Sequence, residues 1–123
     1  MQNYKRFDIY ARVFRFGIEV AALINKLPKD LVLLEYSKQL VRSSGSVGAN
    51  LEEADGALSR KDFINKVGIS RREAQESHHW LRLVSSRVSE KELYKQEIEL
   101  LIRESKEIAL ILSSIINKTK ENY

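Results

Sequence analysis

Residues 43–59 read SSGSVGANLEEADGALS, and together with the apolar-periodic segment 62–83 that follows them they decide the fold of this chain. Small side chains dominate the first part of the stretch, and Gly56 suits the left-handed position that commonly ends a helix. Ser59 can cap a new helix, with Asp62 in the first turn, where the helix dipole favours negative charge. The stretch therefore predicts two long helices joined by a short turn, around which the rest of the chain packs.

The composition favours a chain made of helices alone. The 123 residues include one proline and five glycines, and Leu, Ile, Glu, Lys and Arg are abundant. A chain of this length builds one packed core, so we expect a single domain over residues 1–123. There are 21 lysines and arginines against 17 aspartates and glutamates, a net charge of +4. This mildly basic balance permits nucleic-acid partners without requiring them.

Several classes of protein are excluded by what the chain lacks. It contains no cysteine, which excludes disulfides, thiolate metal sites and cysteine nucleophiles. The N-terminal residues MQNYKRFDIYAR are charged throughout and have no apolar signal core. The longest uncharged run, 108–117, is far short of the ~20 residues that span a bilayer. We therefore expect a soluble, cytoplasmic protein with no membrane partner.

Helix-breaking and helix-capping residues divide the chain into four segments. Pro28 ends the first helix and Asp30 can cap the second. Ser89 and Glu92 form a full S-x-x-E capping box that predicts the start of the fourth helix. The expected helices lie over about 4–25, 31–55, 60–86 and 90–117. Four helices joined by short turns predict an all-α, antiparallel, up-down-up-down four-helix bundle.

The first helix carries more apolar surface than a monomeric bundle requires. One apolar stripe consists of Phe7, Tyr10, Phe14, Ile18, Ala21 and Ile24, and a neighbouring one of Ile9, Val13, Phe16, Val20, Leu23 and Leu27. Together they cover more than half of the helix circumference, whereas a core-facing stripe is little more than ~100° wide. The excess predicts an oligomer. Its expected interface residues are Ile9, Phe16, Ile69 and Trp80.

One flank of the expected third helix is basic, with no carboxylate among its side chains. It consists of Arg60, Lys61, Arg71, Arg72, His78, His79 and Arg82. Such a row can contact successive phosphates of a nucleic acid, and repetition around a symmetry axis strengthens both the field and the avidity. An ordinary solvated helix face is the competing interpretation. Arg12 and Arg15 are second candidates for the same contact.

No set of residues predicts a reaction. Glu76 and His79 have the Glu-x-x-His spacing of di-iron bundles, but such a site needs more ligands than the two adjacent histidines of this chain supply. Glu53 and Glu73 could act as acid and base, yet no nucleophile or phosphate loop accompanies them. A buried polar network fits better. Its expected members are Asn50, Glu53, Glu73 and Ser77, with an arginine as a further partner.

The motifs resemble a known bacterial family. They are Leu27-Pro28-Lys29, Gln39-Leu40, Arg42, SVGANLEEA over 46–54, Ser59, Asp62-Phe63, EAQES over 73–77, and Trp80-Leu81. This pattern is similar to that of the four helix bundle proteins, also called the 23S rRNA intervening sequence protein family because some members are encoded inside insertions in large-subunit ribosomal RNA genes. The resemblance spans nearly the whole chain. It implies a left-handed antiparallel bundle that assembles into a ring, commonly a homopentamer.

A distant relative of that family, the accessory variability protein of diversity-generating retroelements, forms a similar basic pentamer and binds nucleic acid and a reverse transcriptase. We therefore expect a non-enzymatic homo-oligomer, without cofactor or metal, that contacts the backbone of RNA or DNA. Two alternatives stay open. One is an adaptor that binds a protein partner and no nucleic acid. The other is a metal-dependent bundle enzyme.

Overall fold

The computed structural model describes the backbone of residues 2–122 and the side chains of residues 9–122. The described chain consists of four helices and no strand: α1 (Gln2–Ile24), α2 (Leu31–Asp55), α3 (Arg60–Ser86) and α4 (Lys95–Glu121). The all-α fold class expected from the sequence is thus observed. None of these helices, within the described residues, combines the length and the apolar character needed to cross a bilayer.

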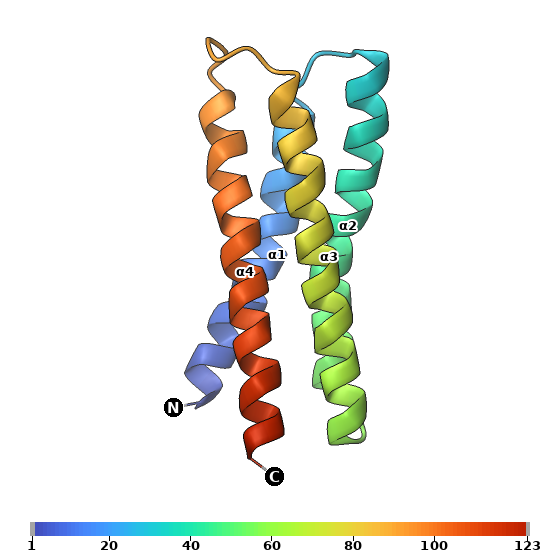
Figure 1. Cartoon of the computed structure of the whole chain (residues 1–123), viewed down its shortest axis with the longest axis vertical. Coiled ribbons are helices and arrows are strands. Elements are labelled where there is room, and N and C mark those ends of the chain that lie inside the picture. Colours follow the sequence, from blue (N-terminus) through green and yellow to red (C-terminus); the bar gives the residue numbers. More distant parts are fainter. Residues whose placement is uncertain (1, 123) are drawn as a thin grey trace.

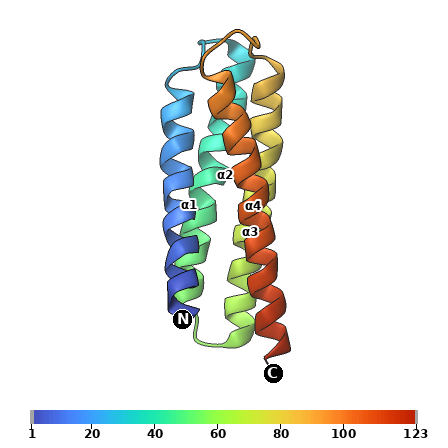
Figure 2. The ribbon, with the colours of Figure 1, turned by 90° about the vertical axis from the view of Figure 1, so that its left-hand side faces the viewer.

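The four helices lie side by side as an elongated bundle (Figure 1). The α1–α2 and α3–α4 connections lie at one end, and the α2–α3 turn lies at the other end together with both chain ends (Figure 2). The helix pairs in contact are α1 with α2, α2 with α3, α3 with α4, and α1 with α4. The surface shared by α1 and α2 is therefore on the opposite side of the bundle from the surface shared by α3 and α4.

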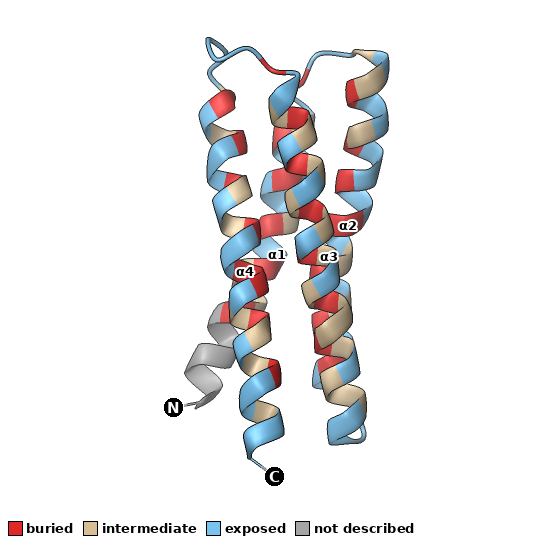
Figure 3. Ribbon diagram, viewed as in Figure 1, coloured by how far each residue is buried: buried red, intermediate tan, exposed pale blue. Residues whose placement is uncertain are grey.

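The core runs along the bundle axis, with buried positions on the inner face of every helix (Figure 3). Its largest fully buried side chains are Phe16, Leu23, Leu33, Leu40, Leu51, Leu81, Ile98, Ile108 and Leu112. The helical spacing of these residues produces one apolar stripe on each helix, and burial of the four stripes against one another is the main source of stability.

Three buried serines mark the contact between α2 and α3. Ser43 and Ser77 face each other with their Oγ atoms 2.8 Å apart, and the Ser70 Oγ donates to the Val47 carbonyl oxygen at 2.6 Å. All three side chains are fully buried. Serine allows two backbones to approach closely, and each hydroxyl is satisfied by a partner, so burial costs little. This seam corresponds to the small-residue stretch quoted first.

The helix starts show which capping expectations hold. The Asp30 carboxylate accepts from the N–H groups of Val32 and Leu33 at 2.8 and 3.2 Å, and the Ser59 Oγ accepts from the N–H of Asp62 at 3.0 Å. Gly56 follows α2 with φ −93°, so it ends the helix without the expected left-handed conformation. Its N–H donates to the Glu53 carbonyl oxygen at 3.1 Å, which is compatible with an ordinary turn.

The expected start of the fourth helix at residue 90 is wrong, because α4 begins at Lys95. The Ser89 Oγ accepts from the N–H of Lys91, two residues on, which forms a local turn in place of a capping box. Lys95 itself explains the later start. Its ammonium donates to the carbonyl oxygens of Ser85 at 2.6 Å and Val88 at 3.3 Å, which ties the first turn of α4 to the end of α3.

A second correction concerns α1. Ile9 and Phe16, expected at an oligomer interface, are 2% and 0% exposed and belong to the core of the chain itself. The neighbouring stripe faces outward instead, with Phe14 64% and Ile18 56% exposed. The charged residues of α1 lie on its third face, on the α4 side, which fits this orientation. Arg12 reaches an acidic group on α4, which turns Phe14 and Ile18 away from α4 and towards the α2 side.

Candidate nucleic-acid interface

The surface shared by α3 and α4 is lined by basic side chains from both helices. We call the outward side of α3, together with the adjoining part of α4, the basic α3–α4 face; it comprises Arg60, Lys61, Arg71, Arg72, His78, His79, Arg82, Lys106 and Lys120. The seven α3 members are those expected from the sequence. Lys106 and Lys120 were not predicted, because the helical pattern of a sequence shows only which residues share a face of one helix. Their spacing places both lysines on α4, but only the packing of α4 against α3 shows that they adjoin the basic residues of α3.

At the end of the bundle near the α2–α3 turn, basic side chains from two helices converge. Arg60 and Lys61, in the first turn of α3, and Lys120, in the last turn of α4, line a shallow recess of about 550 Å³. Ile64 and Asn65 form the rest of its wall. Asp62 is the acidic residue of the first turn of α3, but it does not line the recess.

The middle of the face contains Arg71 and Arg72. Arg72 is exposed, whereas Arg71 is half-buried and its guanidinium donates to the Ser113 Oγ on α4 at 3.3 Å. Arg71 therefore helps to join the two helices, and its removal would affect packing as well as surface charge. Arg72 and Arg82, both exposed, are the cleaner reporters of the charge on this face.

At the far end of the face, His78 lies among other basic side chains. Partial burial lowers the pKa of His78 below its usual value of 6.5, and the charges of Arg82, Lys106 and His79 lower it further. No carboxylate contributes to that shift. Beyond this cluster the Glu99 carboxylate accepts from the Ser85 Oγ at 3.2 Å. The gathering of Arg82, Lys106 and His79 around His78 is an arrangement that attracts phosphate.

The second pair of candidates lies elsewhere. The Arg12 guanidinium makes two hydrogen bonds with the Glu104 carboxylate, of 3.0 and 2.6 Å, between α1 and α4. This half-buried bidentate pair fastens the two helices together, so Arg12 is a structural residue in this arrangement. Arg15 is exposed on α1, which is not one of the two helices of the basic face.

The four residues of the expected polar network do not form one network. Glu73 pairs with Arg42 on α2 at 3.3 Å, which fits the expected arginine partner, and Glu53 pairs with Lys66 at 2.8 Å. The Glu53 carboxylate raises the pKa of Lys66. Asn50 donates to a carbonyl oxygen of its own helix, while Ser77 contacts Ser43 in the buried seam. Both glutamates are thus engaged by cations.

The remaining candidates cluster where α2 meets α3. Trp80 is half-buried, its ring lies 6.0 Å from that of Tyr36, and its Nε1 donates to the Glu76 carboxylate. Arg42 also binds Glu76, so the carboxylate of the Glu-x-x-His pair has two partners already. Within residues 9–122, no three potential metal-ligating side chains lie together. Ile69 is also half-buried on α3.

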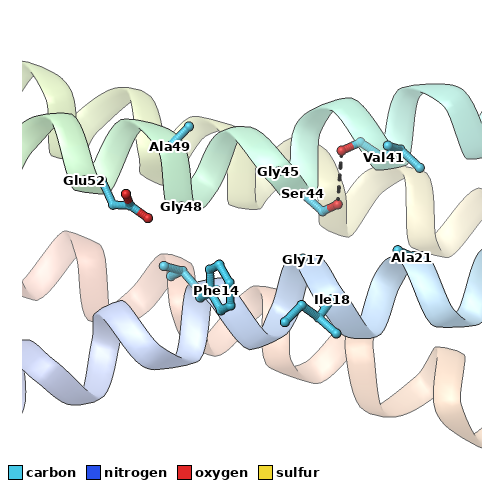
Figure 4. A pocket seen from close by; sticks show the side chains of 11 residues that line it. Phe14, Gly17, Ile18, Ala21, Val41, Ser44, Gly45, Gly48, Ala49 and Glu52 are labelled. Carbon is cyan, nitrogen blue, oxygen red and sulfur yellow. Dashed lines mark hydrogen bonds between the residues drawn. The ribbon is translucent and has the colours of Figure 1, made fainter.

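The opposite side of the bundle carries an apolar surface. We call it the apolar α1–α2 groove, a hollow of about 510 Å³ lined by Val13, Phe14, Gly17, Ile18, Ala21, Val41, Ser44, Gly45, Gly48, Ala49 and Glu52. Phe14 and Ile18 project from α1 opposite the small residues of α2, and Glu52 lies at the Phe14 end (Figure 4). A Cβ added at Gly45 would meet no atom within 4 Å. The packing of the chain itself therefore does not require glycine there.

Sequence comparison identifies the family. The model of the 23S rRNA-intervening sequence proteins matches residues 5–114. The chain belongs to this family. A crystal structure from Bacteroides thetaiotaomicron, of a protein with unknown function from the S23 ribosomal protein family, has 32% sequence identity to this chain. The alignment covers 88% of this chain and 97% of that chain, with a TM-score of 0.73. Among curated proteins no sequence matches the chain.

Proposed function

We propose that this chain is a non-enzymatic nucleic-acid-binding protein that contacts the backbone of RNA or DNA through the basic α3–α4 face. The observation that carries the proposal is the gathering of basic side chains from two helices on one face. The family name, which refers to ribosomal RNA, adds support for RNA. Contacts to phosphate fix position without reading sequence, so we expect little sequence preference.

Charge reversal on the basic face tests this proposal. The double variant Arg72→Glu/Arg82→Glu replaces two exposed cations and should weaken binding of single-stranded RNA by about tenfold or more, because phosphate contacts are lost and repulsion is added. Its melting temperature should stay close to that of the parent, since exposed substitutions change stability by less than about 0.5 kcal/mol each. Fluorescence anisotropy and thermal unfolding measure the two quantities.

The matched control is Lys29→Glu/Lys38→Glu, which changes the net charge equally at exposed positions outside α3 and α4. Equal losses of affinity in the two double variants would mean that only net charge matters. That result would contradict a defined face. No binding by the parent at low salt would contradict the proposed function itself and favour a protein adaptor.

We also propose that each chain is a left-handed bundle with up-down-up-down order. Copies of this bundle assemble into a ring, which the family resemblance implies is a homopentamer. The exposed Phe14, Ile18 and Val41 of the apolar α1–α2 groove support a contact with a second copy, since burial of such side chains stabilises association. Because the groove lies opposite the basic face, every copy in the ring could keep its cations accessible. Ile18→Lys should reduce the native mass, and an unchanged mass would exclude this surface as the contact.

A further inference from the structure

The recess at the end of the basic face combines a hollow with cations from two helices. Elsewhere on α3 the exposed cations follow one another along the helix, whereas here three of them border one hollow of about 550 Å³. Two come from the first turn of α3 and one from the last turn of α4. Several cations around one hollow suit a compact ligand with more than one negative charge.

Two of the charges of the recess, those of Lys61 and Lys120, are available for a ligand. Within the described residues, the Lys61 and Lys120 side chains are exposed and take part in none of the chain's ion pairs or hydrogen bonds. Asp62, next to Lys61 in the sequence, does not line the recess, and its charge adds to the effect of Glu53 in raising the pKa of Lys66. The recess also adjoins the N-terminal end of α3, where the helix dipole adds to the attraction for an anion.

We infer that this recess binds the terminal phosphate monoester of a nucleic-acid strand. A terminal phosphate carries a charge of about −1.5 to −2 at pH 7 and three acceptor oxygens, whereas an internal phosphodiester carries a single charge. Lys61 and Lys120 contact the phosphate from the two helices, and Arg60 adds a third positive charge. Ile64 provides an apolar wall and Asn65 an amide for the adjoining nucleotide.

The position of the recess fits a strand end. From Lys61 to Arg82 the α3 helix rises by about 30 Å, so the exposed cations form a track that terminates at the recess. A strand laid along this track would present its last phosphate there. The inference thus rests in part on the proposed function, but the recess also makes a separate prediction for a single nucleotide, which is too short to use the track.

The first test titrates the protein with a nucleoside monophosphate and measures binding from the chemical-shift changes of the backbone amides of α3 and α4. The parent protein should respond at residues around the recess, and the matching nucleoside without phosphate should produce no such response. Lys120→Gln should weaken the response about fivefold or more, because a charged hydrogen-bond donor is lost. Lys118→Gln is the matched control, since Lys118 is an exposed lysine of the same last turn but does not line the recess.

The second test compares RNA strands of one sequence that carry a 5′-phosphate, a 3′-phosphate or hydroxyls at both ends. A monoester at one end should tighten binding about fivefold in the parent, and the gain should vanish in Lys61→Gln and Lys120→Gln. The phosphorylated end that produces the gain identifies the strand polarity. Equal binding of all three strands, or equal losses in Lys120→Gln and Lys118→Gln, would overturn the inference.

The two proposals fail in different ways. Strands that bind with a Lys120-independent affinity would leave the basic face in place and eliminate the terminal-phosphate site. A Lys120-dependent response to the nucleotide, without any binding of strands, would keep the recess as a phosphate-monoester site and contradict the proposed nucleic-acid track.

Discussion

Replacement of the buried Lys95 by methionine should destabilise the protein more than the loss of any exposed charge considered above. The residue is only 8% exposed, and its ammonium donates to the carbonyl oxygens of Ser85 at 2.6 Å and Val88 at 3.3 Å. A hydrogen bond from a charged donor contributes about 1.5–3 kcal/mol. Glu90, whose carboxylate lies 3.5 Å from the ammonium, is largely exposed and adds little.

Methionine keeps the length and apolar stem of the side chain, so Lys95→Met isolates the loss of the ammonium. The two carbonyl groups lose the ammonium as a donor, while the Ser85 oxygen still accepts from the N–H of Val88. The cost of burying a charge also disappears, and we expect a net loss of about 2–3 kcal/mol. For a chain of this size that corresponds to a fall in melting temperature of roughly 8–12 °C. Chemical denaturation followed by circular dichroism measures the difference in free energy of unfolding.

Lys91→Met is the matched control, because Lys91 is exposed on the same α3–α4 connection. Its free energy of unfolding should stay within about 0.5 kcal/mol of the parent value. If Lys95→Met were as stable as Lys91→Met, Lys95 would not join α3 to α4. The physical account of the delayed start of α4 would then be wrong.

Three further predictions concern stability and pH. Ser70→Leu should lower the free energy of unfolding by about 1–3 kcal/mol through overpacking of the α2–α3 seam, whereas Ser114→Leu at an exposed position should change it little in the same denaturation assay. Asp30→Ala should lower the melting temperature at neutral pH. Arg87 and two N–H groups lower the pKa of Asp30, so the carboxylate stabilises the fold above pH ~4 and this effect disappears in acid. The melting temperatures of parent and variant should therefore converge at acid pH. Burial and the charges of Arg82, Lys106 and His79 lower the pKa of His78, so its protonation at acid pH destabilises the free protein but adds a positive charge that attracts phosphate. RNA affinity should therefore rise as the pH falls below ~6.5. His78→Gln should reduce that rise in anisotropy titrations at constant salt.

Local signals in the sequence predicted the helices well because the relevant contacts are local. Asp30 and Ser59 cap α2 and α3 through N–H groups two or three residues away. The start of α4 could not be predicted in this way. Ser89 and Glu92 have the spacing of a capping box, but the Lys95 contact with the end of α3 involves residues seven and ten positions apart, on the far side of the connection.

The two stripes of α1 show a different limit. Both are apolar and helical in spacing, so a single helix offers no reason to prefer one as the core side. The choice depends on α4, where Glu104 and Glu97 accept hydrogen bonds from Arg12 and Lys26. The contribution of Lys106 and Lys120 to the basic face has the same origin, since both depend on how α4 packs against α3.

The dependence of RNA affinity on salt concentration tests the central claim most directly. If about five cations of the basic α3–α4 face each neutralise one phosphate of a single strand, a plot of log K against log salt concentration should be linear with a slope of about −3.5. In Arg72→Glu/Arg82→Glu the slope should become less negative by about 1.4. A parent slope near zero, or the same slope in this variant, would contradict binding of the nucleic-acid backbone by this face.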